Sequence, residues 1–185
     1  MGHPHADGRL SGVALALPAD TAGALRVEVL RAANRVAELA PGRLGKWKLE
    51  PAALARPPAT LRADSWTAHP HGATQWSSVT PFVFDQHPKA KDKTAYLHES
   101  AVMISAACER IGLRRPHEVI VTSVSAHLGV PPAHAFPRLR RKDGSERRHT
   151  HAILVFAEPV CGPILVGAGR YRGYGFFRAM DSHDA

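Results

Sequence analysis

The segment from Val160 to Phe177, V-C-G-P-I-L-V-G-A-G-R-Y-R-G-Y-G-F-F, combines residue types that suit phosphate binding. Glycine accepts positive φ and lets a backbone approach a ligand closely, and successive inward amides can cradle a phosphate. Arginine binds phosphate through two nitrogens, and tyrosine offers a stacking surface for a base. The glycine-rich loop of residues 162–177 therefore predicts a grip on an RNA backbone, although a tight hairpin with basic decoration fits the same residues. The predicted contacts are Gly167, Gly169, Arg170, Tyr171, Arg172, Gly173 and Gly175.

A second basic segment precedes the last strands. Residues 126–148 are rich in proline and then in charge, which predicts an exposed, partly mobile loop whose basic part covers residues 142–148. Such a loop is well placed to follow phosphates, and a solvated charged surface is the alternative. Its cations are Arg138, Arg140, Arg141, Lys142, Arg147 and Arg148; the predicted RNA contacts are Arg138, Arg140, Arg141 and Lys142.

The composition agrees with a polyanion as partner. The chain of 185 residues has a formal net charge of +8 and a pI of about 10.1. Nucleic acid is the commonest polyanion that such a charge attracts. Hydrophobic residues make up 44% of the chain, enough for a core and too many for wholesale disorder.

Histidine is abundant, with 12 residues, and three H-x-H pairs occur. Histidines supply acid–base groups near neutral pH or metal ligands. No H-E-x-x-H or C-x-x-C spacing accompanies the pairs, so we expect no metal and no cofactor, and metal-dependent hydrolysis is the weaker alternative. The pairs are His3/His5, His69/His71 and His149/His151.

Cysteine usage and hydropathy indicate the compartment. The two cysteines, Cys108 and Cys161, make no disulfide framework, so we expect a cytoplasmic protein. Cys108 lies on the apolar stripe of a predicted helix and is expected to fill the core. No apolar run is long enough to cross a bilayer, so no membrane partner is expected.

The order of predicted elements indicates an α+β fold. Strand, helix, strand, strand, helix and strand, followed by a C-terminal hairpin, form the ferredoxin-like βαββαβ arrangement of RNA-recognition modules. We expect one domain over residues 1–185, with two helices on one face of an antiparallel sheet and a ligand on the other. Strands are predicted at 12–17, 43–50, 78–84, 118–125, 151–157, 164–166 and 174–178, with helices over 21–40 and 94–111.

Four pieces of the chain resemble a known family. They are H-A-D-G-R-L-S-G-V-A-L-A-L-P (His5–Pro18), W-S-S-V-T-P-F-V-F-D-Q-H-P-K (Trp76–Lys89), H-A-I-L-V-F (His151–Phe156) and the glycine-rich end. The glycine-rich end resembles that of the CRISPR-associated RAMP proteins. Together the pieces resemble the guide-RNA-processing half of the fused RAMP protein of type I-U, or I-G, CRISPR systems.

The resemblance implies a metal-independent endoribonuclease that cuts precursor CRISPR RNA within its repeats. A ribose 2′-hydroxyl attacks the adjacent phosphorus and leaves a 2′,3′-cyclic phosphate. This chemistry needs a base and cations. The active histidine varies in position among related processing nucleases, so the resemblance does not settle which one is the base. We rank the candidates His5, His87 and His151, in that order, and take Lys89 as a possible transition-state cation. The implied partners are CRISPR repeat RNA and other effector subunits, including the N-terminal RAMP half of the fusion, which this chain lacks. The other reading is a non-catalytic subunit that holds the RNA, as many RAMP proteins do.

Overall fold

The computed structural model describes Val13, Leu15, Leu17 and residues 21–40, 45–50 and 62–180. Two compact units divide the chain, one covering residues 10–58 and the other the remaining residues, and each is described by itself. The expectation of a single domain over residues 1–185 stays a prediction.

The smaller unit holds one helix and a short two-stranded sheet. Helix α1 covers Gly23–Ala33, and β1 (Glu38–Leu39) pairs antiparallel with β2 (Trp47–Lys48). The helix predicted to run to residue 40 is thus shorter, because the apolar spacing continues into residues that pair as a strand. None of the residues of α1 is buried, so the expectation that this helix covers a sheet is not supported.

The strand predicted at 12–17 falls largely outside the described residues. Of its residues the structure describes Val13, Leu15 and Leu17, and none of the three lies in a strand. Val13 is 56% exposed and Leu15 is 69% exposed, which disagrees with the expectation of a buried strand.

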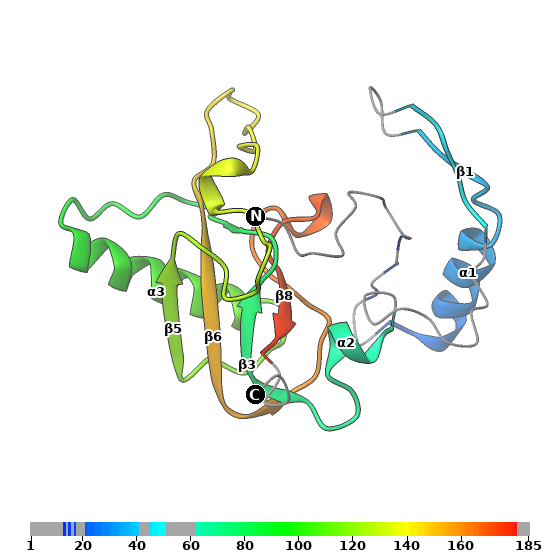
Figure 1. Cartoon of the computed structure of the whole chain (residues 1–185), viewed down its shortest axis with the longest axis horizontal. Coiled ribbons are helices and arrows are strands. Elements are labelled where there is room, and N and C mark those ends of the chain that lie inside the picture. The colour runs from blue at the N-terminus through cyan, green and yellow to red at the C-terminus, as the bar shows by residue number, and fades with distance from the viewer. Residues whose placement is uncertain are drawn as a thin grey trace. The chain divides into compact units, whose positions relative to one another are not determined.

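The larger unit is built on an antiparallel sheet (Figure 1). Its long strand, β6, pairs with β5 on one side and with β3 on the other, and β4 pairs with the start of β6. Strand β8 pairs with the other side of β3, and β7 pairs with β8. The strands are β3 (Ala73–Ser78), β4 (Phe82–Val83), β5 (Glu118–Thr122), β6 (His149–Val160), β7 (Ile164–Leu165) and β8 (Phe176–Ala179).

Helix α3 (Lys93–Glu109) connects β4 to β5 and packs against the sheet. The side chain of Asp92, rather than the expected Thr94, caps it by accepting a hydrogen bond from the amide of Ala95 at 2.9 Å. Because β3 and β5 both run antiparallel to β6, they are parallel to each other with β6 between them. The segment from β3 to β6 is therefore a split βαβ unit.

The core lies between α3 and one face of the sheet. Trp76 of β3 and Leu154 of β6 are paired across the ladder, and both are wholly buried with Ile104 of α3. Cys108 belongs to the same cluster, as the helical stripe predicted, and its burial raises the pKa of the thiol to about 12.

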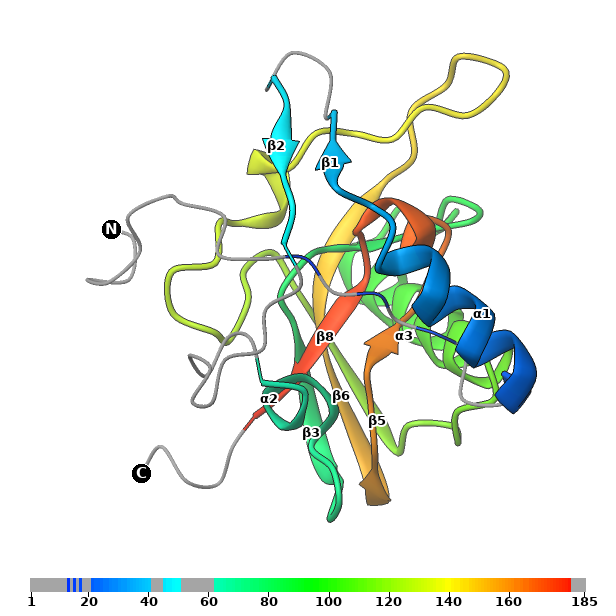
Figure 2. The same ribbon diagram turned by 90° about the vertical axis from the view of Figure 1, so that its right-hand side faces the viewer.

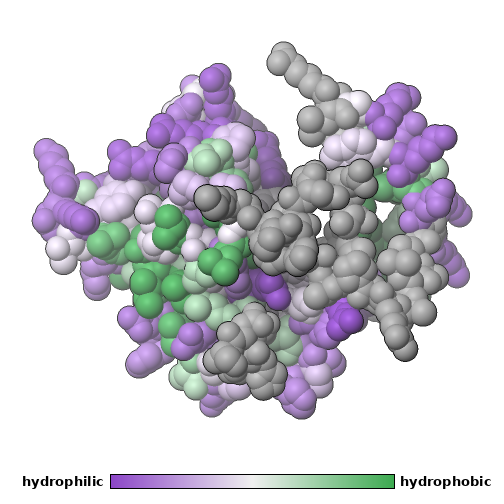
Figure 3. Space-filling view, in the orientation of Figure 1, coloured by the Kyte–Doolittle hydropathy of each residue, from purple (hydrophilic) through white to green (hydrophobic). Residues whose placement is uncertain are grey.

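The opposite face of the sheet carries aliphatic side chains. Ile153 and Ile120 lie side by side in the β5–β6 ladder, and Ile120 is 43% exposed. Figure 3 shows hydrophobic residues gathered over these strands. The same face carries Arg178 of β8, which pairs with Ser77 of β3 and whose side chain contacts the carbonyl of Ser65 and the ring of Trp66. More arginines gather at the end of the sheet where β6 begins.

The segment before β6 forms a hairpin, which we name the basic arm and define as residues 138–148. Its two sides are joined by hydrogen bonds from the amide of Arg147 to the carbonyl of Leu139 and from the amide of Arg141 to that of Ser145, both 2.7 Å. Figures 1 and 2 show the arm extending beyond the end of the sheet where β6 begins. The predicted loop thus has a defined backbone. The chain also forms short helices: α2 (Asp64–Thr67), η3 (Ala133–Ala135) and η4 (Arg170–Arg172).

The fold is therefore mixed α and β with an antiparallel sheet and few helices, and the expected C-terminal hairpin is present as β7 and β8. In the described part of the chain, no helix is long and apolar enough to cross a membrane.

Candidate nucleic-acid interface

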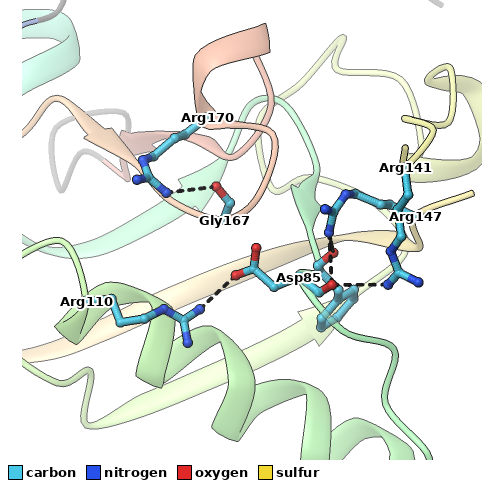
Figure 4. A network of polar contacts seen from close by, with 7 residues as sticks. Asp85, Arg110, Arg141, Arg147, Gly167 and Arg170 are labelled. Atoms are coloured by element: carbon cyan, nitrogen blue, oxygen red, sulfur yellow. Dashed lines mark hydrogen bonds and ion pairs between the residues drawn. The ribbon is translucent and has the colours of Figure 1, made fainter. Parts of the chain in front are cut away.

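Arginine side chains converge on the chain just after β4 (Figure 4). Arg147 donates to the main-chain carbonyls of Phe84 and Asp85 at 3.1 and 2.9 Å, and Arg141 donates to the carbonyl of Asp85 at 3.1 Å. The carboxylate of Asp85 faces the other way and pairs with Arg110, at the end of α3, at 3.0 Å. The main chain of Asp85 thus fixes two guanidinium groups of the arm.

These two guanidinium groups make no direct ion pair, although the carboxylate of Asp143 lies close enough that Arg141, after the hydrogen bonds from Ser145, lowers the pKa of Asp143. Within the described residues, neither Arg141 nor Arg147 forms an ion pair, since their acceptors are carbonyl oxygens. On the same arm, Arg138 pairs with Glu146 at 2.9 Å. A cation that is held in place without a carboxylate partner is suited to a phosphate. The predicted contacts Arg140 and Lys142 are exposed farther along the arm.

His87 lies among the same arginines. Burial of the ring, followed by the charges of Arg141 and Arg148, lowers its pKa below the ordinary value for histidine, and this outweighs a hydrogen bond with the main chain of Glu146 that raises it. The imidazole is therefore neutral at neutral pH and able to accept a proton. Its Nδ1 atom is buried and has no hydrogen-bond partner within the described chain.

His151 occupies a different environment. Its side chain is wholly buried, with Nδ1 2.8 Å from Oγ of Ser78 and Nε2 3.0 Å from the carbonyl oxygen of Pro131. The amide of Ala152 donates to the same Ser78 oxygen, so the hydroxyl donates to Nδ1 and Nε2–H donates to Pro131. Burial lowers the pKa of His151. With both nitrogens engaged and no exposure, His151 is a structural residue, which corrects its ranking as a candidate base.

The root of the basic arm is held by two more polar side chains. His149 places Nε2 2.7 Å from the carbonyl oxygen of Ala133, and the hydroxyl of Tyr174 donates to the carbonyl of Pro137. With the bond of His151 to Pro131, three carbonyls of one short segment are bound from β6 and from the glycine-rich loop. The H-x-H spacing of β6 therefore serves to position the arm.

The remaining catalytic candidates have fewer contacts. Lys89 is exposed, two residues after His87, and its amide donates to the carboxylate of Glu99 at 2.8 Å. Its ammonium group has no partner in the described chain and is available to an anion. His5 lies outside the described residues.

The glycines of the C-terminal loop serve packing more than ligand binding. Gly167, Gly169 and Gly175 are buried. A Cβ atom on Gly167 would come within 2.7 Å of the carbonyl oxygen of Val83, and one on Gly175 within 1.8 Å of that of Val166. These positions admit only glycine because protein backbone, not a ligand, lies against them.

Most main-chain amides of this loop are also engaged. The amide of Ala168 donates to the carbonyl of Val83, and that of Gly175 donates to Pro81, at 3.0 and 2.8 Å. The expectation that bare amides cradle a phosphate therefore needs correction, since these groups already have protein acceptors. Further amides with acceptors in the protein include those of Gly162, Val166, Arg170, Arg172, Tyr174 and Phe176.

The exposed part of the loop is the η4 turn. Tyr171 is 84% exposed, and the guanidinium carbon of Arg170 lies 4.6 Å from the centre of its ring. Arg172 is exposed, and Gly173 closes the turn with φ of +79° and open space around its Cβ position. The side chains predicted to bind RNA thus remain available.

The structure brings the two predicted basic segments together at one end of the sheet. Gly167 packs against Val83, so η4 stands beside the end of β4, and Figure 4 shows Arg170 in the same region as Asp85, Arg141 and Arg147. We name this region the cationic surface and define it as His87, Arg141, Arg147, Arg148, Arg170, Tyr171 and Arg172.

The sequence did not indicate three residues of this neighbourhood. Asp85 and Arg110 pair across the end of β4, and Tyr96 of α3 lies under the guanidinium of Arg148, 6.0 Å from the ring centre. Asp85 could have been predicted, because it is a carboxylate that directly follows an apolar strand. The sequence spacing gave no reason to place Arg110 or Tyr96 near Asp85.

A cavity of about 340 Å³ is lined by Ala63, Asp64, Thr67, His69 and Gly162, without an arginine or a lysine. Among the described residues, no group of three or more His, Cys, Asp or Glu side chains is placed to hold a metal ion.

Comparison with known proteins identifies no relative of the chain. No protein-family model, no curated protein and no solved structure matches the chain.

Proposed function

We propose that the chain binds RNA on the cationic surface and cleaves it there as a metal-independent endoribonuclease. The observation that carries the proposal is the position of His87, a neutral imidazole among the guanidinium groups of Arg141 and Arg148. The net charge of +8 supports a polyanionic substrate.

In the proposed reaction, the imidazole of His87 takes the proton of a ribose 2′-hydroxyl, whose oxygen attacks the adjacent phosphorus. The bond from phosphorus to the 5′-oxygen breaks, giving a 2′,3′-cyclic phosphate and a 5′-hydroxyl that takes its proton from water. The guanidinium groups of Arg141 and Arg148 stabilise the charge that develops on the phosphoryl oxygens. Lys89, whose ammonium group is exposed nearby, adds a further cation.

The resemblance supplies the proposed substrate and partners. We propose that the RNA is precursor CRISPR RNA, cut within its repeats, and that the chain stays on its product with the other subunits of an effector complex. The strand order β5-β6-β3-β8 around a split βαβ unit supports a ferredoxin-like fold of the RAMP type, with β7 and η4 in place of a second helix before the last strand.

A non-catalytic RNA-binding subunit is the second proposal. The exposed ring of Tyr171, stacked on Arg170, favours it because these side chains bind RNA without any proton transfer.

A denaturing gel separates the two proposals. Synthetic CRISPR repeat RNAs are incubated with the protein in excess EDTA, and each is also made with deoxyribose at the cut position. The nuclease predicts fragments with a cyclic phosphate end from the ribose substrate and intact RNA from the deoxyribose substrate. Intact RNA that shifts on a native gel supports the binding subunit, and cleavage of the deoxyribose substrate would falsify the 2′-hydroxyl mechanism.

A further inference from the structure

We infer that the cationic surface takes a single-stranded stretch of RNA, with one base stacked on Tyr171, another on Tyr96, and the phosphates between them on the arginines. The inference rests on the proposed RNA binding and adds the strandedness of the substrate and a second stacking residue, Tyr96.

The first stacking position is the η4 turn. The ring of Tyr171 is 84% exposed, and Arg170 covers one of its two faces at 4.6 Å. A stacked base needs one face only, so the other face is available. The guanidinium behind the ring strengthens the platform because it holds the ring in place and adds positive charge.

The second stacking position is the first turn of α3. Tyr96 is half-buried, and its ring lies 6.0 Å from the guanidinium carbon of Arg148. Tyr96 and Arg148 thus form the same kind of pair as Tyr171 and Arg170, at a longer distance.

The two positions are joined by one short stretch of main chain, Val83–Asp85. Gly167, whose carbonyl oxygen lies 3.5 Å from a nitrogen of Arg170, packs against Val83. The amide of Phe84 donates to the carbonyl of Arg148 at 3.0 Å, and Arg147 donates to the carbonyls of Phe84 and Asp85. Val83 ends β4 and Asp85 lies in a bend, so η4 and the arginines of the arm meet around three consecutive residues.

The arrangement favours single strands over duplexes. Stacking on a side chain requires an unpaired base, whereas the bases of an A-form helix are already stacked on each other. A duplex would reach the arginines with its phosphates and leave both tyrosines unused. The tyrosines therefore favour single-stranded RNA over duplex RNA, whereas the arginines bind the phosphates of both.

Fluorescence anisotropy with three labelled probes tests the inference: a single-stranded uridine 12-mer, a 12-base-pair RNA duplex and a single-stranded thymidine 12-mer. We expect the uridine 12-mer to bind about tenfold more tightly than the duplex. Tyr171→Ala and Tyr96→Ala should each weaken the uridine 12-mer about tenfold and leave the duplex within about twofold, while Tyr171→Phe and Tyr96→Phe retain binding. The thymidine probe shows whether the ribose contributes.

Equal affinity for single strand and duplex, or alanine variants that bind the uridine 12-mer normally, would overturn the inference. Far-UV circular dichroism of each variant excludes misfolding, and Tyr96→Leu, which keeps an apolar side chain but has no ring, tests stacking at this position if Tyr96→Ala fails to fold. If binding depends on the tyrosines but no RNA is cut, the nuclease proposal fails and this inference stands. If the protein cleaves RNA but binds single strand and duplex equally well, the nuclease proposal stands and this inference fails.

Discussion

Oγ of Ser78 lies 2.8 Å from Nδ1 of His151, inside the sheet and away from solvent. This pair joins β3 to β6, and the other ring nitrogen of His151 binds the carbonyl of Pro131 in the segment that leads into the basic arm. His151, a candidate base in the sequence, thus helps to position the segment that leads into the basic arm.

The first prediction concerns the pH dependence of stability. The pKa of His151 is lower in the folded protein than in the unfolded chain, where it is near 6.5. The stabilisation due to the neutral ring is therefore complete above about pH 6.5 and is lost as the pH falls through the lowered pKa. The free energy of unfolding in urea should decrease from about pH 7 to about pH 5, and less steeply in His151→Gln, which does not titrate.

The exposed His134, replaced in His134→Gln, is the control for this prediction and should leave the slope unchanged. His87, whose pKa is also lowered, accounts for a part of the slope that remains in His151→Gln. Identical slopes in His151→Gln and the wild type would contradict the structural role of His151.

A second prediction separates two glycines of the same loop. Gly175→Ala should lower the free energy of unfolding by more than about 2 kcal/mol, because the new Cβ atom meets the carbonyl oxygen of Val166 and φ is +67°. Gly173→Ala has positive φ as well but open space around it, so its cost should stay near 1 kcal/mol. Urea unfolding midpoints measure both. Equal costs would mean that Gly175 does not pack as described.

The elements that sequence reasoning predicted best are those decided by local pattern. The steps of three and four between Leu97 and Ile111 predicted α3, because Ile104 and Cys108 of that stripe pack on the sheet, although Leu97 is 38% exposed. The β-branched run after Glu118 predicted β5 for a similar reason. Helix α1 ended earlier than expected because residues 38–39 pair with β2, a choice that helical spacing alone does not reveal.

The candidate site was predicted in composition but not in arrangement. Glycines that contact a ligand and glycines that pack on Val83 look the same in a sequence, since both need the absence of Cβ. The burial of His151 depends on Pro131, far away in the chain, lying over it. The pairing of Asp85 with Arg110 likewise depends on tertiary structure.

A third prediction concerns Asp85, the carboxylate among these arginines. Asp85→Asn removes a negative charge while retaining an oxygen for Arg110, so RNA affinity should rise severalfold. Anisotropy with the uridine 12-mer at fixed salt measures the change. Glu118→Gln, an equal change of charge at the start of β5, is the control and should have little effect. Weaker binding by Asp85→Asn would place the RNA elsewhere.

A fourth prediction tests the arm by its salt dependence. Replacing Arg140 and Lys142 by alanine should reduce the slope of log affinity against log salt concentration by about 1.4, if each contacts one phosphate of a single strand. The double replacement of Arg114 and Arg115 removes the same charge from side chains that already pair with Glu158 and Glu109, and should leave the slope nearly unchanged. Equal slopes in the two double variants would count against phosphate contacts by the arm.

The measurement that tests the central claim most directly is the single-turnover rate of repeat RNA cleavage by His87→Gln in EDTA. The variant should bind RNA as the wild type does and cleave it at least about 100-fold more slowly, since it keeps the arginines and lacks the base. His134→Gln should cleave at the wild-type rate. A His87→Gln protein that cleaves normally would contradict the account.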